Sequence, residues 1–515
     1  MRLPTLIDAG RGLLAAAVLA TALLPSHQEA SADNRAAGRG ERLAKQMCVA
    51  CHRSSPPDVL PRDAWRQVIE KMATILAGKG IEGWGQQGPE VPLSAEYRAI
   101  LEYYESKAPV ALPALPTWPP VGDHPLRFVR RQIAWKDAVT LEPAVSNVRL
   151  VDRQREGRLE AIVCDMRQGA VLSVPLYESG AGLRLMAQVP HPAHATPVDL
   201  DGTHPQDLLV ADLGEFFPGD HERGTVTWLR ARPDGGYAPF VIGGFPRVAD
   251  VEAGDFDGDG RLDLLVAGFG WHRKGGIFLL LNRTTDWKDP KFERVTVDAR
   301  PGPIHVIPVD LDRDGRLDFV TVIAQEHEAV VAFLGDGKGG FQAQTLYAAP
   351  HPNWGSTGIQ LVDLDGDGDL DVLATNGDMF DDGILKPYHG IQWLENLGGL
   401  TFKPHPLANL AGAHRAIAQD LDGDGDLDIL ASAFTGLAED RGANLPSLVW
   451  LEQTRRGHFE RHTIAAGMPS YATLDAGDID GDGDIDIVAG VFKLRSKSES
   501  WLDVWENQRL SPRAR

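Results

Sequence analysis

Two different hydrophobic patterns divide the chain into a short first part and a long second part. Within residues 33–108, apolar residues recur at helical spacing and mark one face of a predicted helix: Trp65, Val68, Ile69 and Met72. A second such face follows Ser94, a favourable N-cap, and contains Tyr97, Ile100, Leu101 and Tyr104. From about residue 125 onward, short apolar runs alternate with loops rich in aspartate and glycine, which is typical of β-strands. The pattern predicts a small all-α domain followed by an all-β domain.

The second part is built from one repeated unit. Its core reads D-x-D-x-D-G-x-x-D and is followed by an apolar strand; the first full copy begins at Asp255. Further full copies begin at Asp310, Asp363, Asp420 and Asp478, and two degenerate copies begin at Asp152 and Asp199. Successive units start 47 to 58 residues apart. A period of this size indicates a repeat architecture.

Each unit is predicted to contain four short strands, as in residues 358–362, 372–374, 391–394 and the segment from Phe402. Four-stranded units at this period match the blades of a β-propeller. The last unit ends after residues 502–507 without a fourth strand, whereas residues 126–133 resemble a fourth strand placed before the first unit. This segment can complete the last blade and close a ring of seven, which removes exposed edges. An open solenoid or an eighth blade remains the alternative. The motif and its spacing resemble the FG-GAP or VCBS repeat family over residues 125–515.

The aspartate loops predict calcium sites. Calcium prefers six to eight oxygen ligands, and aspartates at loop positions 1, 3, 5 and 9 with a carbonyl at position 7 can supply them. The predicted ligands are Asp255, Asp257, Asp259, Asp263, Asp310, Asp312, Asp314, Asp318, Asp363, Asp365, Asp367, Asp371, Asp420, Asp422, Asp424, Asp428, Asp478, Asp480, Asp482 and Asp486. About five bound ions would also explain most of the net charge of −21. The alternative is that the motif serves only as a turn.

The first part contains a haem-attachment motif. Cys48-Val49-Ala50-Cys51-His52 is a C-x-x-C-H sequence, in which the two thiols bind haem covalently and the histidine ligates iron. The alternatives are a redox dithiol or half of a zinc site. A redox dithiol would need a βαβ setting, and a zinc site would need further Cys or His ligands nearby, but none follows before His124. Together with the predicted helices, the motif resembles a small class I cytochrome c with one haem. In that family a methionine is the usual sixth ligand, and Met72 is the candidate; core packing is its alternative role. Its short distance from the motif departs from the family.

Two further segments organise the chain. Residues 1–32 predict a secretory signal, with an apolar run at 13–24 and a cleavage site after Ala32, so the protein is expected to be periplasmic or secreted. An uncleaved anchor is the alternative. Residues 109–124 contain five prolines and predict a semi-rigid linker between the cytochrome domain at 33–108 and the propeller at 125–515.

Composition narrows the function classes. The 515 residues are 43% hydrophobic and 24% charged, which excludes wholesale disorder. The acidic balance argues against binding nucleic acid. Three cysteines exclude a disulfide scaffold. No apolar run in the mature chain is long enough for a transmembrane segment.

Four polar residues stand five or six positions before aspartate loops of different units, where the first strand of each blade begins: His194, Asp250, His305 and His414. We expect them to converge near the central channel, on the face opposite the calcium loops. The alternative is that these four residues are ordinary polar residues of surface loops, where they contact water or stabilise turns.

Two functions follow. The first is electron transfer through one covalent haem, with a calcium-stabilised propeller that binds a redox partner protein or a small-molecule ligand. The second is a haem-coupled oxidoreductase whose substrate is oxidised in the propeller funnel. The sequence leaves open whether the protein is an enzyme. A sugar-binding adhesin is less economical, because it gives the haem no role.

Overall fold

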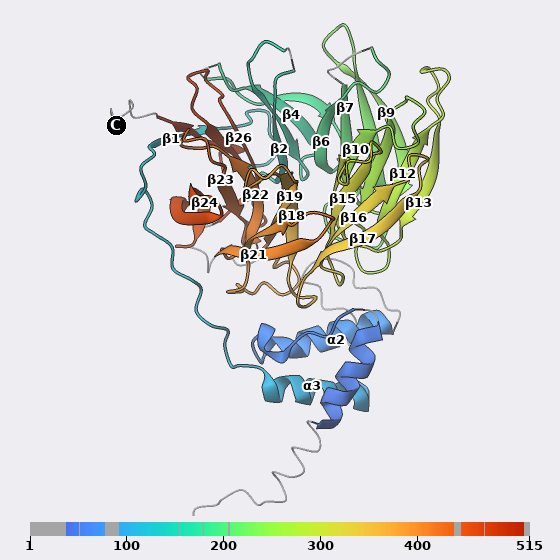
Figure 1. The fold of residues 1–515 in the computed structure, drawn as a ribbon, viewed down its shortest axis with the longest axis vertical. Coiled ribbons are helices and arrows are strands. Elements are labelled where there is room, and N and C mark those ends of the chain that lie inside the picture. Colours follow the sequence, from blue (N-terminus) through green and yellow to red (C-terminus); the bar gives the residue numbers. More distant parts are fainter. Residues whose placement is uncertain are drawn as a thin grey trace, which may run out of the picture.

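The computed structural model describes residues 38–50, 52–77, 92–153, 155–178, 180–203, 207–436, 444–467 and 469–508. The predicted signal at 1–32 and Cys51 lie outside the described residues. A β-propeller forms most of the protein, and a small group of helices lies against one of its faces (Figure 1). No helix among the described residues is both long enough and apolar enough to cross a membrane.

The propeller has seven four-stranded antiparallel blades. Blade 1 contains β2 (Val145–Val151), β3 (Glu160–Asp165), β4 (Ala170–Pro175) and β5 (Arg184–Gln188). Blade 2 contains β6 (Pro192–Val198), β7 (Asp207–Asp212), β8 (Gly224–Ala231) and β9 (Tyr237–Phe245). Blade 3 contains β10 (Val248–Gly254), β11 (Asp263–Gly268), β12 (Gly276–Asn282) and β13 (Phe292–Asp298). Blade 4 contains β14 (Pro303–Val309), β15 (Asp318–Ile323), β16 (Ala329–Gly335) and β17 (Phe341–Ala348).

The remaining blades follow the same order. Blade 5 contains β18 (Ser356–Val362), β19 (Asp371–Asn376), β20 (Gly390–Asn396) and β21 (Phe402–Asn409). Blade 6 contains β22 (Ala413–Gln419), β23 (Asp428–Ala433), β24 (Pro446–Arg455) and β25 (His458–Ala466). Blade 7 contains β26 (Tyr471–Gly477), β27 (Asp486–Val491) and β28 (Leu502–Asn507), and β1 (Phe128–Ile133) completes it. The predicted seven-bladed propeller is therefore confirmed.

The ring closes where the sequence predicts. Strand β1 pairs antiparallel with β28 along its whole length, from Phe128 opposite Asn507 to Ile133 opposite Leu502. Arg130 also contacts Asp503 at 2.6 Å, and Arg131 contacts Glu506 at 2.8 Å. Because the last blade takes its outer strand from the start of the domain, the two ends of the domain are held in one sheet and the edge of β28 is paired.

The core lies between neighbouring blades. The second strands β7, β11, β15, β23 and β27 are buried at every position, which explains their continuous apolar sequences. Outer strands such as β13 have only half-buried and exposed positions. The hydrophobic clusters join residues of adjacent blades; Leu209 of blade 2, for example, belongs to the same cluster as Val251 of blade 3.

The helical domain has a small core of its own. Residues 38–47 are helical and lead into a 3-10 turn at Cys48–Ala50. A second such turn at Pro57–Val59 precedes α2 (Ala64–Leu76) and α3 (Ala95–Lys107). Trp65 of α2 stacks on Tyr104 of α3 with ring centroids 4.1 Å apart. The Ser94 hydroxyl accepts the backbone N–H of Tyr97 at 3.3 Å, so the predicted N-cap is confirmed.

The proline-rich segment at 109–124 is fixed to the outside of the propeller, where Figure 1 shows it running up toward β1. The Trp118 indole donates to the carbonyl of Asn409 at 3.0 Å. The Thr463 hydroxyl donates to the carbonyl of Pro119 at 2.7 Å. The linker is thus attached to blades 5 and 6, which limits how far the helical domain can move.

Candidate functional sites

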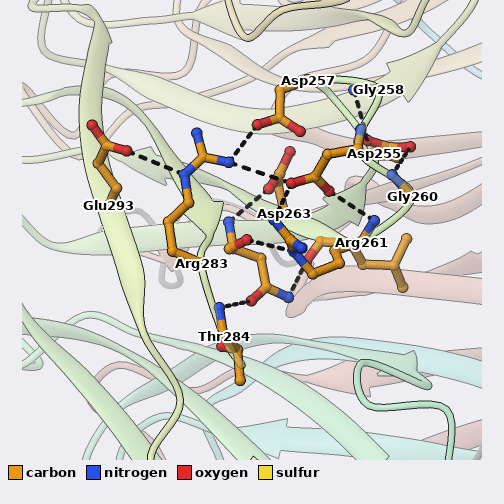
Figure 2. Close-up of polar contacts among 12 residues, drawn as sticks. Asp255, Asp257, Gly258, Gly260, Arg261, Asp263, Arg283, Thr284 and Glu293 are labelled. Atoms are coloured by element: carbon orange, nitrogen blue, oxygen red, sulfur yellow. Dashed lines mark hydrogen bonds and ion pairs between the residues drawn. The ribbon is translucent and has the colours of Figure 1, made fainter. Parts of the chain in front are cut away.

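Each intact aspartate loop is folded around its first aspartate. Figure 2 shows the loop of blade 3, where Asp255 accepts the backbone N–H of Gly258 at 2.8 Å and of Gly260 at 3.0 Å. Asp310 likewise accepts from Asp314 and Gly315, both at 3.0 Å. The glycine at position 6 has a positive φ in every intact loop, +84° at Gly260, which side chains rarely tolerate. The motif therefore encodes a tight turn even before any ion binds.

The same turn gathers carboxylates at a spacing suitable for a cation. Oxygens of Asp255, Asp257 and Asp259 lie within 4.8 Å of one another. The groups Asp310, Asp312, Asp318 and Asp363, Asp365, Asp371 meet the same criterion. Moreover, Oδ1 of Asp257 is buried without a hydrogen-bond partner. An unsatisfied carboxylate oxygen inside an all-oxygen cluster fits the ligand preference of calcium.

The ninth aspartate of each loop has a structural role that sequence reasoning missed. Asp263 accepts the backbone N–H of Asn282 at 2.7 Å with one oxygen and of Phe256 at 3.1 Å with the other. Asp318, Asp371, Asp428 and Asp486 repeat this bridge between loop and third strand. Burial, followed by nearby carboxylates, raises the pKa of Asp263 to about 6 and of Asp428 to about 7. A carboxylate has lone pairs left for a cation as well.

Arginines contact several of these loops. Arg283 contacts Asp257 at 2.6 Å, as Figure 2 shows, and Arg456 contacts Asp365 at 2.9 Å. In the degenerate loop of blade 2, Arg230 contacts Asp201 at 2.7 Å and the Trp228 indole donates to Asp207 at 3.0 Å. Positive and neutral donors from the protein itself thus satisfy the carboxylates that remain in this loop.

The central channel brings together three of the four polar residues that the sequence singles out. Nδ1 of His194 lies 2.5 Å from Oδ1 of Asp250, and Nδ1 of His305 lies 3.7 Å from Oδ2 of the same carboxylate. They stand at matching positions of the inner strands β6, β10 and β14, directly after a register shift near the start of each strand. Glu252, two residues farther along β10, lies with His194 and Asp250 in one group within 4.8 Å.

The fourth residue, His414, occupies a different position. The register shift in β22 falls between Ala413 and Arg415, so Arg415 stands at the position that corresponds to His194 and His305. His414 is the bulged residue and packs edge-on against Phe434, with ring centroids 5.6 Å apart. Burial lowers the pKa of His414 to about 4. His414 stands six residues before its loop instead of five, but this spacing does not by itself show that a bulge in β22 turns it away from the channel position.

The acidic side chains in the channel lie beside histidine and arginine side chains that offset their charge. Burial would raise the pKa of Asp250, but His194 and His305 outweigh it and hold that pKa below its usual range. Burial and the charge of Asp250 raise the pKa of Glu252. Arg149 lies 3.7 Å from Glu252 and donates to Thr196 at 2.9 Å. The channel therefore contains a small network of acids, imidazoles and guanidinium groups.

An apolar cluster lies on the face where the inner strands begin. It contains Met166, Phe216, Phe380, Phe434 and Phe492, which come from loops of five different blades. Phe434 and Phe492 have ring centroids 5.0 Å apart, and Phe216 and Phe492 6.4 Å. These side chains join five blades in one apolar cluster on that face.

The helical domain docks on the same face, over blades 3 to 5. Arg53 donates to the carbonyl of Ala349 at 2.5 Å, and Lys71 contacts Asp381 at 2.6 Å. Arg273 donates to the carbonyl of Ile75 at 2.6 Å. The charge of Lys71 lowers the pKa of Asp381 to about 2. The partners on the propeller belong to loops on the side opposite the aspartate loops.

Three of the four predicted haem ligands, Cys48, His52 and Met72, lie in the described part of this docked domain. Cys48 begins the turn at Cys48–Ala50 and is half-buried, and burial raises the pKa of its thiol. Nδ1 of His52 lies 2.6 Å from the carbonyl of Arg53. Metal-bound histidines usually make such a hydrogen bond with the nitrogen that does not face the metal. Met72 is half-buried on α2, next to the Lys71 that contacts the propeller. The contact of His52 with a backbone carbonyl is the kind that a metal-bound histidine makes.

Comparison with known proteins agrees with the blade pattern. The family model for the FG-GAP-like repeat matches residues 199–266 and 310–374. These two stretches are FG-GAP-like repeats. Each begins at an aspartate loop and ends within the second strand of the next blade, β11 or β19. The repeats thus fall in register with the blades. No curated protein matches the chain.

Proposed function

We propose that the protein is an exported c-type cytochrome that transfers electrons through one covalent haem, with a calcium-stabilised propeller that binds a redox partner protein or a ligand. The C-x-x-C-H motif and the hydrogen bond from His52 to a backbone carbonyl carry this proposal. Haem c supplies one-electron redox chemistry when bound. Cys48 and Cys51 would attach it, His52 would be one axial ligand, and Met72 is the candidate for the other.

The FG-GAP-like propeller suggests binding of a ligand or a partner. The docked helical domain brings the motif close to the propeller, since Arg53, directly after His52, donates to the carbonyl of Ala349 at 2.5 Å. A partner bound at the edge of this interface would therefore be close to the proposed haem. Attachment of the linker to blades 5 and 6 favours one fixed arrangement over many.

A reduced-minus-oxidised absorption spectrum of the purified chain, exported from a host that attaches haem c, tests the proposal. We expect a c-type spectrum with one haem per chain, lost in Cys48→Ser and Cys51→Ser. A spectrum without haem in the exported wild-type protein would overturn the proposal.

Met72 can be tested separately. Met72→Ala should remove the weak iron–sulfur absorption at the red end of the oxidised spectrum and leave haem attached. Met47→Ala is the matched control, because Met47 directly precedes the motif and packs against the helical core. An unchanged spectrum in Met72→Ala would exclude Met72 as ligand and keep the haem.

A second candidate function is a haem-coupled oxidoreductase with its substrate in the funnel. The contact of His194 and His305 with Asp250, on the side of the channel nearer the helical domain, favours it. If it is correct, changing both histidines to alanine should reduce substrate-driven haem reduction and leave reduction by dithionite intact. If the double variant keeps both substrate-driven reduction and reduction by dithionite, the funnel is not catalytic, and electron transfer with partner or ligand binding remains the function.

A further inference from the structure

We propose that His194, His305, Asp250 and Glu252 form a binding site for one divalent transition-metal ion in the central channel. Such a site would be separate from the aspartate loops, which offer only oxygen ligands. It involves none of the haem ligands, so it stands or falls independently of the function proposed above.

The inner strands create the site through their common register. His194, Asp250 and His305 each follow the bulge near the start of β6, β10 and β14, and Glu252 is two residues beyond Asp250 on the same face of its strand. Three successive blades therefore direct imidazole and carboxylate groups toward one point near the axis. The corresponding positions in the next two blades hold Gly358 and Arg415, neither of which is a metal ligand.

The distances between these groups suit a shared ion. Two ligand atoms bound to one zinc-like ion at about 2.1 Å lie at most about 4.2 Å apart. Asp250 lies 2.5 Å from His194 and 3.7 Å from His305, through its two different oxygens. His194, Asp250 and Glu252 each have one nitrogen or carboxylate oxygen within 4.8 Å of the other two. The 2.5 Å contact is a hydrogen bond and is shorter than the separation of about 3.4 Å between two ligand atoms of a tetrahedral ion, so the His194 and Asp250 side chains must move apart when an ion binds.

The surroundings already orient the ligands. Asp250 accepts the backbone N–H of Val306 at 3.0 Å, and Glu252 accepts the Thr196 hydroxyl at 3.0 Å. Hydrogen bonds of this kind fix ligating carboxylates in metal sites. The His194, Glu252 and His305 side chains retain 18%, 19% and 25% of their exposure, so an ion can reach them.

Ligand type and charge select the metal. Two imidazoles with two carboxylates suit zinc, manganese or iron, whereas calcium favours oxygen alone. The two carboxylates are opposed by Arg149, 3.7 Å from Glu252, and by Arg415, whose charge acts on Asp250. With neutral histidines, a divalent ion balances the charges of the two carboxylates, and Arg149 and Arg415 remain as positive groups beside them.

Zinc binding to the full chain tests the site. The protein is stripped with a chelator, returned to excess calcium so that the loops remain filled, and dialysed against Zn²⁺ at several concentrations; bound zinc is counted by mass spectrometry. We expect one tightly bound zinc in the wild type and at least about tenfold weaker binding in His194→Ala and in His305→Ala. Both positions are partly exposed, so these variants should fold, which thermal melting checks.

Two control variants make the result decisive. His405→Ala removes another histidine–carboxylate pair, 2.7 Å from Glu395, on the outer part of blade 5 and should leave zinc binding unchanged. His462→Ala removes a histidine from a second group, with Glu452 and Glu460, that could hold a metal. Absence of bound zinc in the wild type, retention of it in both channel variants, or its loss only in His462→Ala would overturn the proposal.

Discussion

At the scale of the residue, one buried aspartate in each of these blades connects the aspartate loop to the third strand. In blade 6, Asp428 accepts the N–H of Gln453 at 2.8 Å and of Leu421 at 3.2 Å, and so connects the aspartate loop to β24. Asp207 makes an equivalent contact in the degenerate blade 2, where it accepts the N–H of Ala231 at 2.7 Å. This role explains why the last aspartate of the motif persists in a loop that has lost the aspartate at position 5 and the glycine at position 6.

Asp428→Asn tests that role. An asparagine side chain presents one acceptor oxygen instead of two, so one buried backbone N–H loses its partner, at a cost of about 1–3 kcal/mol in the free energy of unfolding. The exposed Asp426→Asn, two residues away, should cost less than about 0.5 kcal/mol. Urea unfolding should show the difference both in calcium and in a chelator. If it vanishes in the chelator, Asp428 acts only as a metal ligand.

Glu328 provides a pH-dependent prediction. Burial raises the pKa of this side chain to about 8, while it accepts the N–H of Ser356 at 2.8 Å. The folded state therefore holds a proton that the unfolded state has lost between about pH 4.5 and pH 8, and stability falls as pH rises through this range. Glu328→Gln keeps an acceptor without the charge and should remove this contribution, which amounts to about 3.5 kcal/mol of the wild-type loss in stability between pH 5 and pH 8.

Urea unfolding at the two pH values measures this effect. Glu178→Gln, at an exposed position, should retain the wild-type pH dependence. The same pH dependence in wild type and Glu328→Gln would show that the Glu328 carboxyl is ionised in the folded protein.

At the scale of the element, β1 closes the ring and joins the two parts of the chain. It follows the linker directly and forms the outer strand of blade 7. Ile133 at its end is 3% exposed and belongs to the cluster shared by blades 7 and 1, whereas Val129 is 42% exposed. Closure therefore depends on one end of a short strand more than on its middle.

Two alanine substitutions within β1 test the closure. Ile133→Ala should lower the free energy of unfolding by about 2–4 kcal/mol, because it leaves a cavity between blades. Val129→Ala, in the same strand, should change it by less than about 0.5 kcal/mol. Equal and small losses in urea unfolding would mean that β1 contributes little to closing the ring.

At the scale of the whole molecule, the two faces of the propeller differ. One face carries the aspartate loops, and the other carries the apolar cluster and the docked helical domain. Blades 3 to 5 contact the helical domain, whereas the apolar cluster contains residues from blades 1, 2, 5, 6 and 7. Together they involve loops of all seven blades on the face where the inner strands begin.

Calcium removal should affect the propeller and the helical domain unequally. An ion bound only to the folded state stabilises it by about 2.7 kcal/mol per site at one hundred times its Kd. Adding a chelator should therefore lower the Tm of the propeller by at least about 5 °C. The β-sheet signal in circular dichroism measures this Tm. The helical signal should shift much less. Identical melting in the two conditions would mean that arginines such as Arg283 are enough to stabilise the loops.

The sequence by itself determined the repeat, the seven blades and the source of the closing strand, because the aspartate motif and the apolar strands are local patterns whose period is visible along the chain. It also indicated His194, Asp250 and His305, since equivalent positions of successive repeats must meet at the axis.

Only the tertiary structure decided which neighbouring residues complete these groups. The bulge in β22 puts Arg415 rather than His414 at the equivalent channel position, and Glu252 joins the group only because β10 places it on the same face as Asp250. The side on which the helical domain docks depends on contacts such as Lys71 with Asp381, 310 residues apart. Register shifts and long-range contacts arise from packing between distant segments, so no local pattern of residues encodes them.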